Sequence, residues 1–76
     1  MQFNINDGFA VRDLRQRYGL ARSAVYKRLG QMGIVPQRFG RQSFLTLTEL
    51  TLMDDLDIFI KQGGTAMEFL RRRGLL

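Results

Sequence analysis

The fold is decided by the stretch Val11-Arg12-Asp13-Leu14-Arg15-Gln16-Arg17-Tyr18-Gly19-Leu20-Ala21-Arg22-Ser23-Ala24-Val25-Tyr26-Lys27-Arg28-Leu29, in which two short helical segments flank a glycine. Apolar residues at helical spacing predict a first helix from about Ala10 to Tyr18. Gly19 is the residue type most tolerant of a left-handed turn, so a second helix is predicted over residues 22–32, ending at Gly33.

The second predicted helix has two different faces. Val25, Leu29 and Met32 fall on one apolar stripe. The other face carries side chains that can donate or accept hydrogen bonds, namely Arg22, Ser23, Tyr26 and Lys27. For Tyr26, a position in the core and a role as phosphate donor are equally compatible with the pattern.

A hairpin is predicted directly after this helix. Pro36 prevents the helix from continuing, and residues 37–45 form two extended arms around Gly40. Arg38 and Arg41 flank the bend, while the aromatic residues Phe39 and Phe44 are expected to anchor the hairpin in the core.

Two more helices are marked by capping boxes, in which a threonine and a glutamate three residues later bond to each other's backbone. Thr46 and Glu49 predict the start of a helix over 47–62, with Leu45 and Leu50 as a hydrophobic staple. Thr65 and Glu68 predict the start of another over 66–73. The expected fold class is therefore mainly α with a small β-hairpin.

Composition excludes several functional classes. The chain of 76 residues has room for one domain, and it contains neither cysteine nor histidine. Disulfides, thiolate metal sites and histidine-based catalysis are thereby excluded, and we expect no enzyme activity, cofactor or metal. No apolar run approaches the ~18 residues of a membrane span, and the N-terminus lacks the basic residues of a signal peptide, so a cytoplasmic location is expected.

The charge is unevenly distributed. Twelve Lys and Arg face seven Asp and Glu, for a net charge of +5. Residues 1–44 carry +6, residues 45–64 carry −3, and residues 65–76 carry +2. An arginine-rich half suits a polyanion with planar phosphate or guanine partners, and an acidic helix would be kept away from it.

Together these features resemble a winged helix-turn-helix. Gly19, Leu20 and Val25 sit where the tight turn needs a glycine, an apolar pin and an apolar seat for the second helix. Residues 9 to about 60 resemble the DNA-binding domain of the MerR family and its relatives, such as phage excisionases and small terminase subunits. The resemblance implies one domain over 1–76, with the helix-turn-helix at 9–33, the wing at 34–45 and supporting helices at 47–62 and 66–73.

The resemblance also implies a function, namely sequence-specific binding of double-stranded DNA in transcriptional regulation or in excision or packaging of a mobile element. The second helix would lie in the major groove and the wing on the backbone or the minor groove. The residues expected to read bases are Arg22, Ser23, Tyr26 and Lys27. Those expected on the backbone are Arg12, Arg17, Arg28, Arg38 and Arg41. The protein would act in the bacterial nucleoid or be encoded by a phage or mobile element.

The chain departs from the family at two points. Arg15 stands four residues before the turn glycine, where the family usually has a small residue; either its stem packs along the helix crossing with its head in solvent, or the register is off by one. The chain also lacks the long coiled coil and the cysteines of MerR-type sensors, so no small-molecule effector is expected.

Protein partners are also considered, besides DNA. A single module of this size buries a small interface, so weak binding alone and reliance on pairing or on tandem sites are expected, and the pair could be a homodimer or a complex with a partner protein. The alternative function is a protein-interaction adapter that docks through the acidic third helix and the C-terminal tail. In that helix Asp54, Asp55 and Asp57 diverge by about 100° per residue, which favours a solvated or docking face over a metal site.

Overall fold

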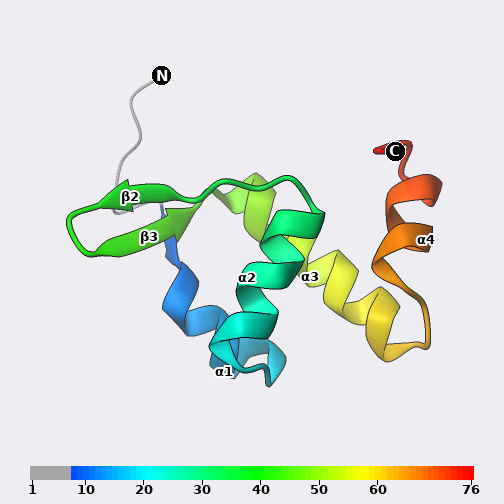
Figure 1. Cartoon of the computed structure of the whole chain (residues 1–76), viewed down its shortest axis with the longest axis horizontal. Helices are drawn as coiled ribbons and strands as arrows, with labels where there is room; N and C mark the ends of the chain where they lie inside the picture. The colour runs from blue at the N-terminus through cyan, green and yellow to red at the C-terminus, as the bar shows by residue number, and fades with distance from the viewer. Residues whose placement is uncertain (1–7) are drawn as a thin grey trace.

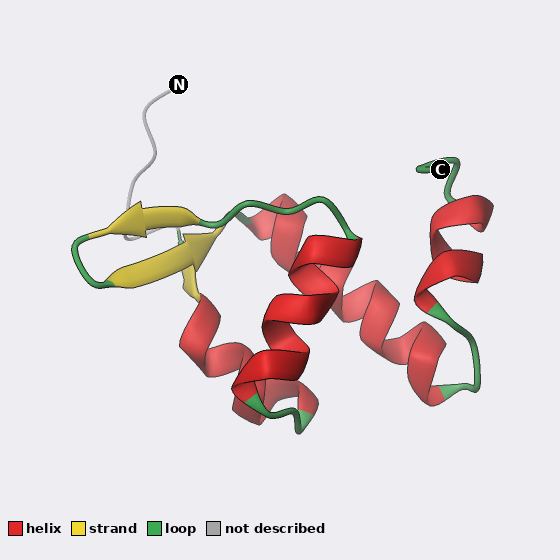
Figure 2. Ribbon diagram, viewed as in Figure 1, coloured by secondary structure: helices red, strands yellow, loops and turns green. Residues whose placement is uncertain are grey.

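The structure, a computed structural model, describes residues 8–76. Residues 1–7 of the predicted domain, with Asp7, lie outside the described part. In chain order the elements are β1 (Phe9–Ala10), the 3-10 helix η2 (Val11–Asp13), α1 (Leu14–Tyr18), α2 (Arg22–Gln31), β2 (Gln37–Phe39), β3 (Gln42–Leu45), α3 (Leu47–Lys61) and α4 (Ala66–Arg72) (Figure 1). Within these residues the protein is mainly helical, with four α-helices and a small antiparallel sheet (Figure 2).

The sheet has three strands in the order β1-β3-β2. The predicted hairpin is confirmed: β2 and β3 pair antiparallel, with Arg38 opposite Ser43, and Gly40 turns the chain with a φ of 61°. Strand β1 was not expected from the sequence. It adds to the other edge of β3, with Phe9 opposite Leu45 and Ala10 opposite Phe44.

The prediction for the first helix was wrong at its start. The helix was expected from about Ala10, but Ala10 belongs to β1 and residues Val11–Asp13 form a 3-10 turn. Only Leu14–Tyr18 is α-helical. The pairing of Ala10 with Phe44 holds the backbone extended there, so the apolar spacing that suggested a longer helix instead reports burial of Val11 and Leu14.

The turn between α1 and α2 matches the prediction. Gly19 has a φ of 67°, in the left-handed region that costs other residues steric strain. The amide of Leu20 donates to the carbonyl of Arg15 at 2.9 Å, which closes the turn over the end of α1. The chain can therefore start α2 at Arg22 after only three linking residues.

One hydrophobic core joins the helices. Leu14 and Tyr18 of α1, Val25 and Leu29 of α2, and Leu45 of β3 are buried together. Helix α3 adds Leu50, Met53 and Leu56, and α4 adds Phe69. In Figure 1, α2 lies in front of α3, while the β2–β3 hairpin and α4 lie at opposite ends of the molecule.

Local capping signals predicted the supporting helices well. Thr46 Oγ1 accepts from the Glu49 amide at 3.2 Å, and the Glu49 carboxylate accepts from the Thr46 amide at 2.9 Å, so the first capping box is complete. At α4, Thr65 Oγ1 accepts from the Glu68 amide, but the Glu68 carboxylate accepts from the Thr65 hydroxyl instead of its amide. The second box is therefore half formed.

Candidate nucleic-acid interface

The outer face of α2 presents the predicted polar side chains to solvent. Arg22, Ser23, Tyr26 and Lys27 are all exposed, whereas Val25 and Leu29 on the opposite stripe are only 1% and 2% exposed. Tyr26 is 42% exposed, which excludes the core position that the sequence had left open. The Arg22 guanidinium lies over the Tyr26 ring, 5.3 Å from its centroid. This contact gives Arg22 a preferred orientation on the first turn of the helix.

The β2–β3 hairpin carries two arginines at its tip. The Nε of Arg38 donates to the carbonyl of Gly40 at 3.0 Å, which ties that side chain across the turn. Arg41 is exposed in the turn itself. Below the tip, Phe39 and Phe44 meet edge to face with their centroids 6.1 Å apart, and Phe44 is buried. The prediction of a buried aromatic anchor is confirmed for Phe44, whereas Phe39 is only partly buried and packs against the Phe44 ring.

A cavity of about 220 Å³ lies between the start of α2, the η2–α1 segment and the hairpin. Four arginines line it, and we call it the arginine pocket: Arg12, Arg15, Arg22 and Arg41. The buried residues Val11 and Val25 contribute apolar surface to it. Residues from three separate parts of the chain thus bring four guanidinium-bearing side chains to one cavity.

Arg15 is the lining residue that the site prediction omitted. Its side chain is exposed and borders the cavity together with Val25 of α2, so the stem lies at the junction of the two helical segments. Gly19, four residues later, adopts the left-handed turn conformation that was predicted for it. In the sequence, Arg15 stands four residues before the turn glycine, between the predicted backbone contacts Arg12 and Arg17.

Each of the three aspartates of α3 pairs with basic side chains of the same chain. Asp54 receives two hydrogen bonds from Arg17, at 2.8 and 2.7 Å, and a third from the Tyr18 hydroxyl at 2.6 Å. Asp57 pairs with Arg28 at 2.9 Å and with Lys61 at 2.8 Å. Asp55 pairs with Arg73 at 2.5 Å. These contacts connect α1, α2 and α4 to α3.

The contacts around Asp54 shift the pKa values of Asp54 and Tyr18. Hydrogen bonding from Arg17 holds the pKa of Asp54 below its ordinary value. Burial, followed by the hydrogen bond to Asp54, raises the pKa of Tyr18 well above its ordinary value. Asp54 is therefore kept as a carboxylate and Tyr18 as a neutral phenol, the pair of states in which the tyrosine donates and the aspartate accepts.

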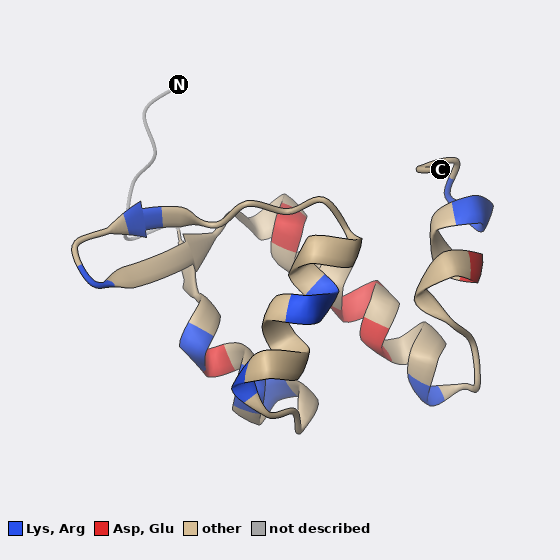
Figure 3. Ribbon diagram, viewed as in Figure 1, with Lys and Arg blue, Asp and Glu red and all other residues tan. Residues whose placement is uncertain are grey.

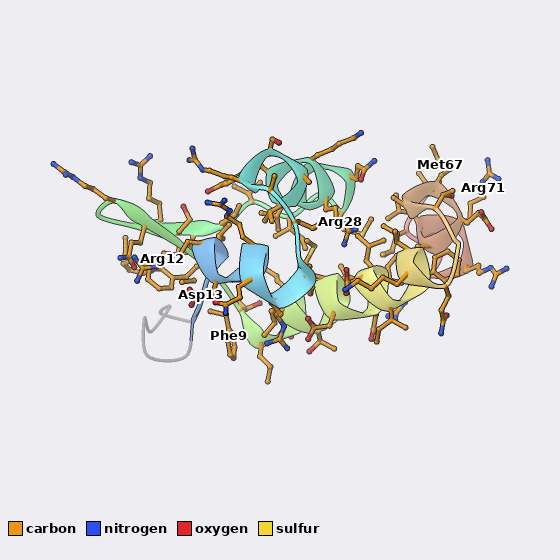
Figure 4. All side chains as sticks on the ribbon, turned by 90° about the horizontal axis from the view of Figure 1, so that it is seen from below. Phe9, Arg12, Asp13, Arg28, Met67 and Arg71 are labelled. Atoms are coloured by element: carbon orange, nitrogen blue, oxygen red, sulfur yellow. The ribbon has the colours of Figure 1, made fainter. Side chains whose placement is uncertain are left out.

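Two of the predicted phosphate contacts have another role in the structure. Figure 4 shows Arg28 between α2 and α3, and its side chain, paired with Asp57, is only 13% exposed. Arg17 is half exposed, but its guanidinium is bound to Asp54. Of the three acidic side chains expected on a solvated or docking face of α3, Asp57 is buried, whereas Asp54 and Asp55 pair with Arg17 and Arg73 and stay partly exposed.

Six cationic side chains of η2, α1, α2 and the hairpin form the candidate interface, and two more that make no ion pair within residues 8–76, Arg71 and Arg72, lie on α4. Of the carboxylates in residues 8–76, none makes an ion pair with the following six side chains: Arg12, Arg15, Arg22, Lys27, Arg38 and Arg41. Figure 3 shows the basic positions on the hairpin, α1 and α2, and the main acidic group on α3 behind them. The internal ion pairs thus neutralise the three aspartates of α3, and the six cations of the candidate interface lie on η2, α1, α2 and the hairpin.

Comparison with known protein families, curated proteins and solved structures found no match to this chain. In the described part of the chain, no helix combines the length and apolar character needed to cross a membrane. The same residues contain no group of three or more His, Cys, Asp or Glu side chains arranged to hold a metal ion.

Proposed function

We propose that the chain is a winged helix-turn-helix domain that binds double-stranded DNA in a sequence-specific way. The observation that carries this proposal is the separation of charge: six cationic side chains without carboxylate partners lie on α2, the η2–α1 segment and the hairpin, while the α3 aspartates are neutralised internally. These cations are available to phosphates without first breaking an ion pair, and phosphate contacts supply most of the affinity in DNA binding.

In this proposal α2 enters the major groove. An α-helix fits that groove, and residues near the helix start reach the base edges in helix-turn-helix proteins. Arg22 and Ser23 are the first two residues of α2, and Tyr26 and Lys27 follow one turn later on the same exposed side. A bidentate pairing of Arg22 with guanine would contribute about 1–3 kcal/mol of discrimination between base pairs.

The hairpin is the proposed wing. It projects at one end of the molecule beside α2 (Figure 2), with Arg38 and Arg41 at its tip. Arginines on a thin two-stranded hairpin reach phosphates or the negative potential of an adjacent minor groove. Ring packing between Phe39 and Phe44 holds the hairpin as a firm support for these contacts.

The biological role we propose is control of transcription, or excision or packaging of a mobile element, in the cytoplasm. An adapter role through the acidic helix is less well supported. The carboxylates of Asp54, Asp55 and Asp57 that would bind a basic partner are occupied by Arg17, Arg73, Arg28 and Lys61.

The proposal is tested by selecting bound sites from random duplexes and then titrating the preferred duplex at several salt concentrations. We expect a steep fall of affinity with salt, and a large loss in the double variant Arg22→Ala, Arg41→Ala. The matched control is Arg71→Ala, which removes an exposed charge from α4, at the opposite end of the molecule from the hairpin. The absence of duplex binding at low salt would rule the proposal out.

A further inference from the structure

The arginine pocket gathers four positive side chains around one cavity. Its four arginines come from η2, α1, α2 and the turn between β2 and β3. No carboxylate lines the cavity, and none of residues 8–76 forms an ion pair with these arginines. Like charges gathered around one hollow repel each other, and an anion placed among them relieves that repulsion.

We propose that the arginine pocket binds a single phosphate group, and that this group belongs to the DNA backbone between the major groove occupied by α2 and the contact made by the hairpin. The inference rests on the proposed function for the source of the phosphate. In this inference the pocket fixes the position of α2 along the duplex, whereas the base-reading side chains select the sequence.

Size and chemistry favour a phosphate over a larger ligand. The cavity volume of about 220 Å³ is below the ~300 Å³ at which pockets begin to hold drug-sized molecules. Guanidinium groups match phosphate oxygens with two parallel N–H donors, a geometry that lysine lacks. All four charged residues of the pocket are arginine, and the one lysine of α2, Lys27, does not line it.

The pocket also has the placement that a register contact needs. Arg22 lines it from the first turn of α2 and contacts the Tyr26 ring. Since the Arg22 guanidinium is assigned to base reading when DNA is bound, Arg12, Arg15 and Arg41 are the proposed ligands of the backbone phosphate, and Arg22 forms the wall of the pocket next to the major groove. Arg41 lines it from the hairpin turn, and Ser43 from β3 adds a hydroxyl. A single phosphate held here would therefore contact both the base-reading helix and the wing. Phosphate contacts of this kind set the orientation of the protein on the duplex without carrying sequence information.

The experiment replaces single phosphates of the selected duplex by neutral methylphosphonates, one position at a time, and measures affinity for two proteins. In the wild-type protein we expect one position, or two adjacent ones, where the replacement weakens binding about 10-fold or more. In the double variant Arg12→Gln, Arg15→Gln the same replacement should weaken binding less than about 3-fold. Both arginines are exposed and make no ion pair within residues 8–76, so the variant should fold.

Two results would overturn the inference while leaving DNA binding intact. One is the same methylphosphonate profile in both proteins, and the other is an equal loss at every position. Arg71→Ala is the control for the loss of positive charge, and it should reproduce the wild-type profile.

A second arm uses inorganic phosphate and the arginine Nε–Hε signals in NMR spectra of the whole chain. We expect shifts concentrated on Arg12, Arg15, Arg22 and Arg41. Equal shifts at Arg71 and Arg72 would show unspecific ion binding and contradict the pocket. Concentrated shifts without any duplex binding would overturn both the DNA function and the backbone as the source, and would assign the pocket to a free phosphate compound.

Discussion

Arg28 of α2 and Asp57 of α3 form an ion pair of 2.9 Å, in which the side chains are only 13% and 10% exposed. The pair joins the proposed recognition helix to the helix behind it. Lys61, one turn further along α3, approaches the second oxygen of Asp57 at 2.8 Å. Because a buried carboxylate without partners is costly, this pair holds α2 against α3.

Removal of Arg28 should therefore destabilise the fold more than removal of Arg17. We expect Arg28→Ala to lower the free energy of unfolding by about 2 kcal/mol, less than the ~3–5 kcal/mol typical of breaking a buried pair, because Lys61 remains beside Asp57. Arg17→Ala should cost about 0.5–1 kcal/mol, because the Arg17 side chain is half exposed and solvent screens its pair. Urea denaturation of both variants gives the comparison; equal losses would contradict the assignment of Arg28 to the interior.

The hydrogen bond from Tyr18 to Asp54 predicts a loss of stability at alkaline pH. The pKa of Tyr18 is raised in the folded state, whereas an unfolded tyrosine ionises near pH ~10. The contribution of the Tyr18–Asp54 hydrogen bond to the free energy of unfolding is therefore fully present below pH ~10. It is lost as the pH rises from there toward the pKa of Tyr18 in the folded state.

The variant Tyr18→Phe isolates this effect. We expect it to cost about 1.5–3 kcal/mol at pH 7, as for a hydrogen bond to a charged group, with the difference from wild type shrinking above pH ~10. Thermal or urea unfolding between pH 8 and pH 11 measures it, and Tyr26→Phe, at an exposed position, is the control. A difference that stays constant over this range would contradict the predicted ionisation.

The capping box of α3 predicts a third effect. Thr46→Ala removes the hydroxyl that accepts from the Glu49 amide, and we expect it to cost about 1 kcal/mol of stability. Thr51→Ala is the matched control, since Thr51 is an exposed threonine inside the same helix, bonded to the Leu47 carbonyl. That replacement should be neutral or slightly stabilising, because alanine has the higher helix propensity. Equal losses in the two variants would show that capping is not the cause.

The parts of the fold that could be predicted from the sequence are those that depend on neighbouring residues. The turn at Gly19 and the capping box at Thr46 each involve residues at most five positions apart, so their signals are local. The two residues of β1 gave no such signal. Their partners, Phe44 and Leu45, lie about 35 positions further along the chain. A strand this short is defined only by the tertiary contact.

For the candidate site too, the sequence predicted local features but not contacts between residues far apart in the chain. Helical periodicity separates the exposed face of α2 from its buried stripe, so Arg22 and Lys27 were placed correctly as exposed residues. It does not tell which arginines are neutralised, because Arg17 and Arg28 find their aspartates 37 and 29 positions away. The sequence also shows an arginine at position 15, but only the folded arrangement of η2, α1, α2 and the hairpin shows that Arg15 borders a cavity.

The proposed division of labour between α2 and the hairpin predicts opposite effects in two single variants. Arg22→Lys keeps the charge but loses the two parallel donors that pair with guanine. It should therefore keep the salt dependence and lower the ratio of preferred to unrelated duplex affinity about 10-fold.

Arg41→Ala removes a hairpin cation, so it should weaken binding to all duplexes alike and reduce the slope of log affinity against log salt by about 0.9. Titrations of both variants on the preferred and an unrelated duplex, at four salt concentrations, measure both quantities. If Arg41→Ala changed the sequence preference while Arg22→Lys changed only the salt slope, the hairpin and not α2 would be the element that reads bases.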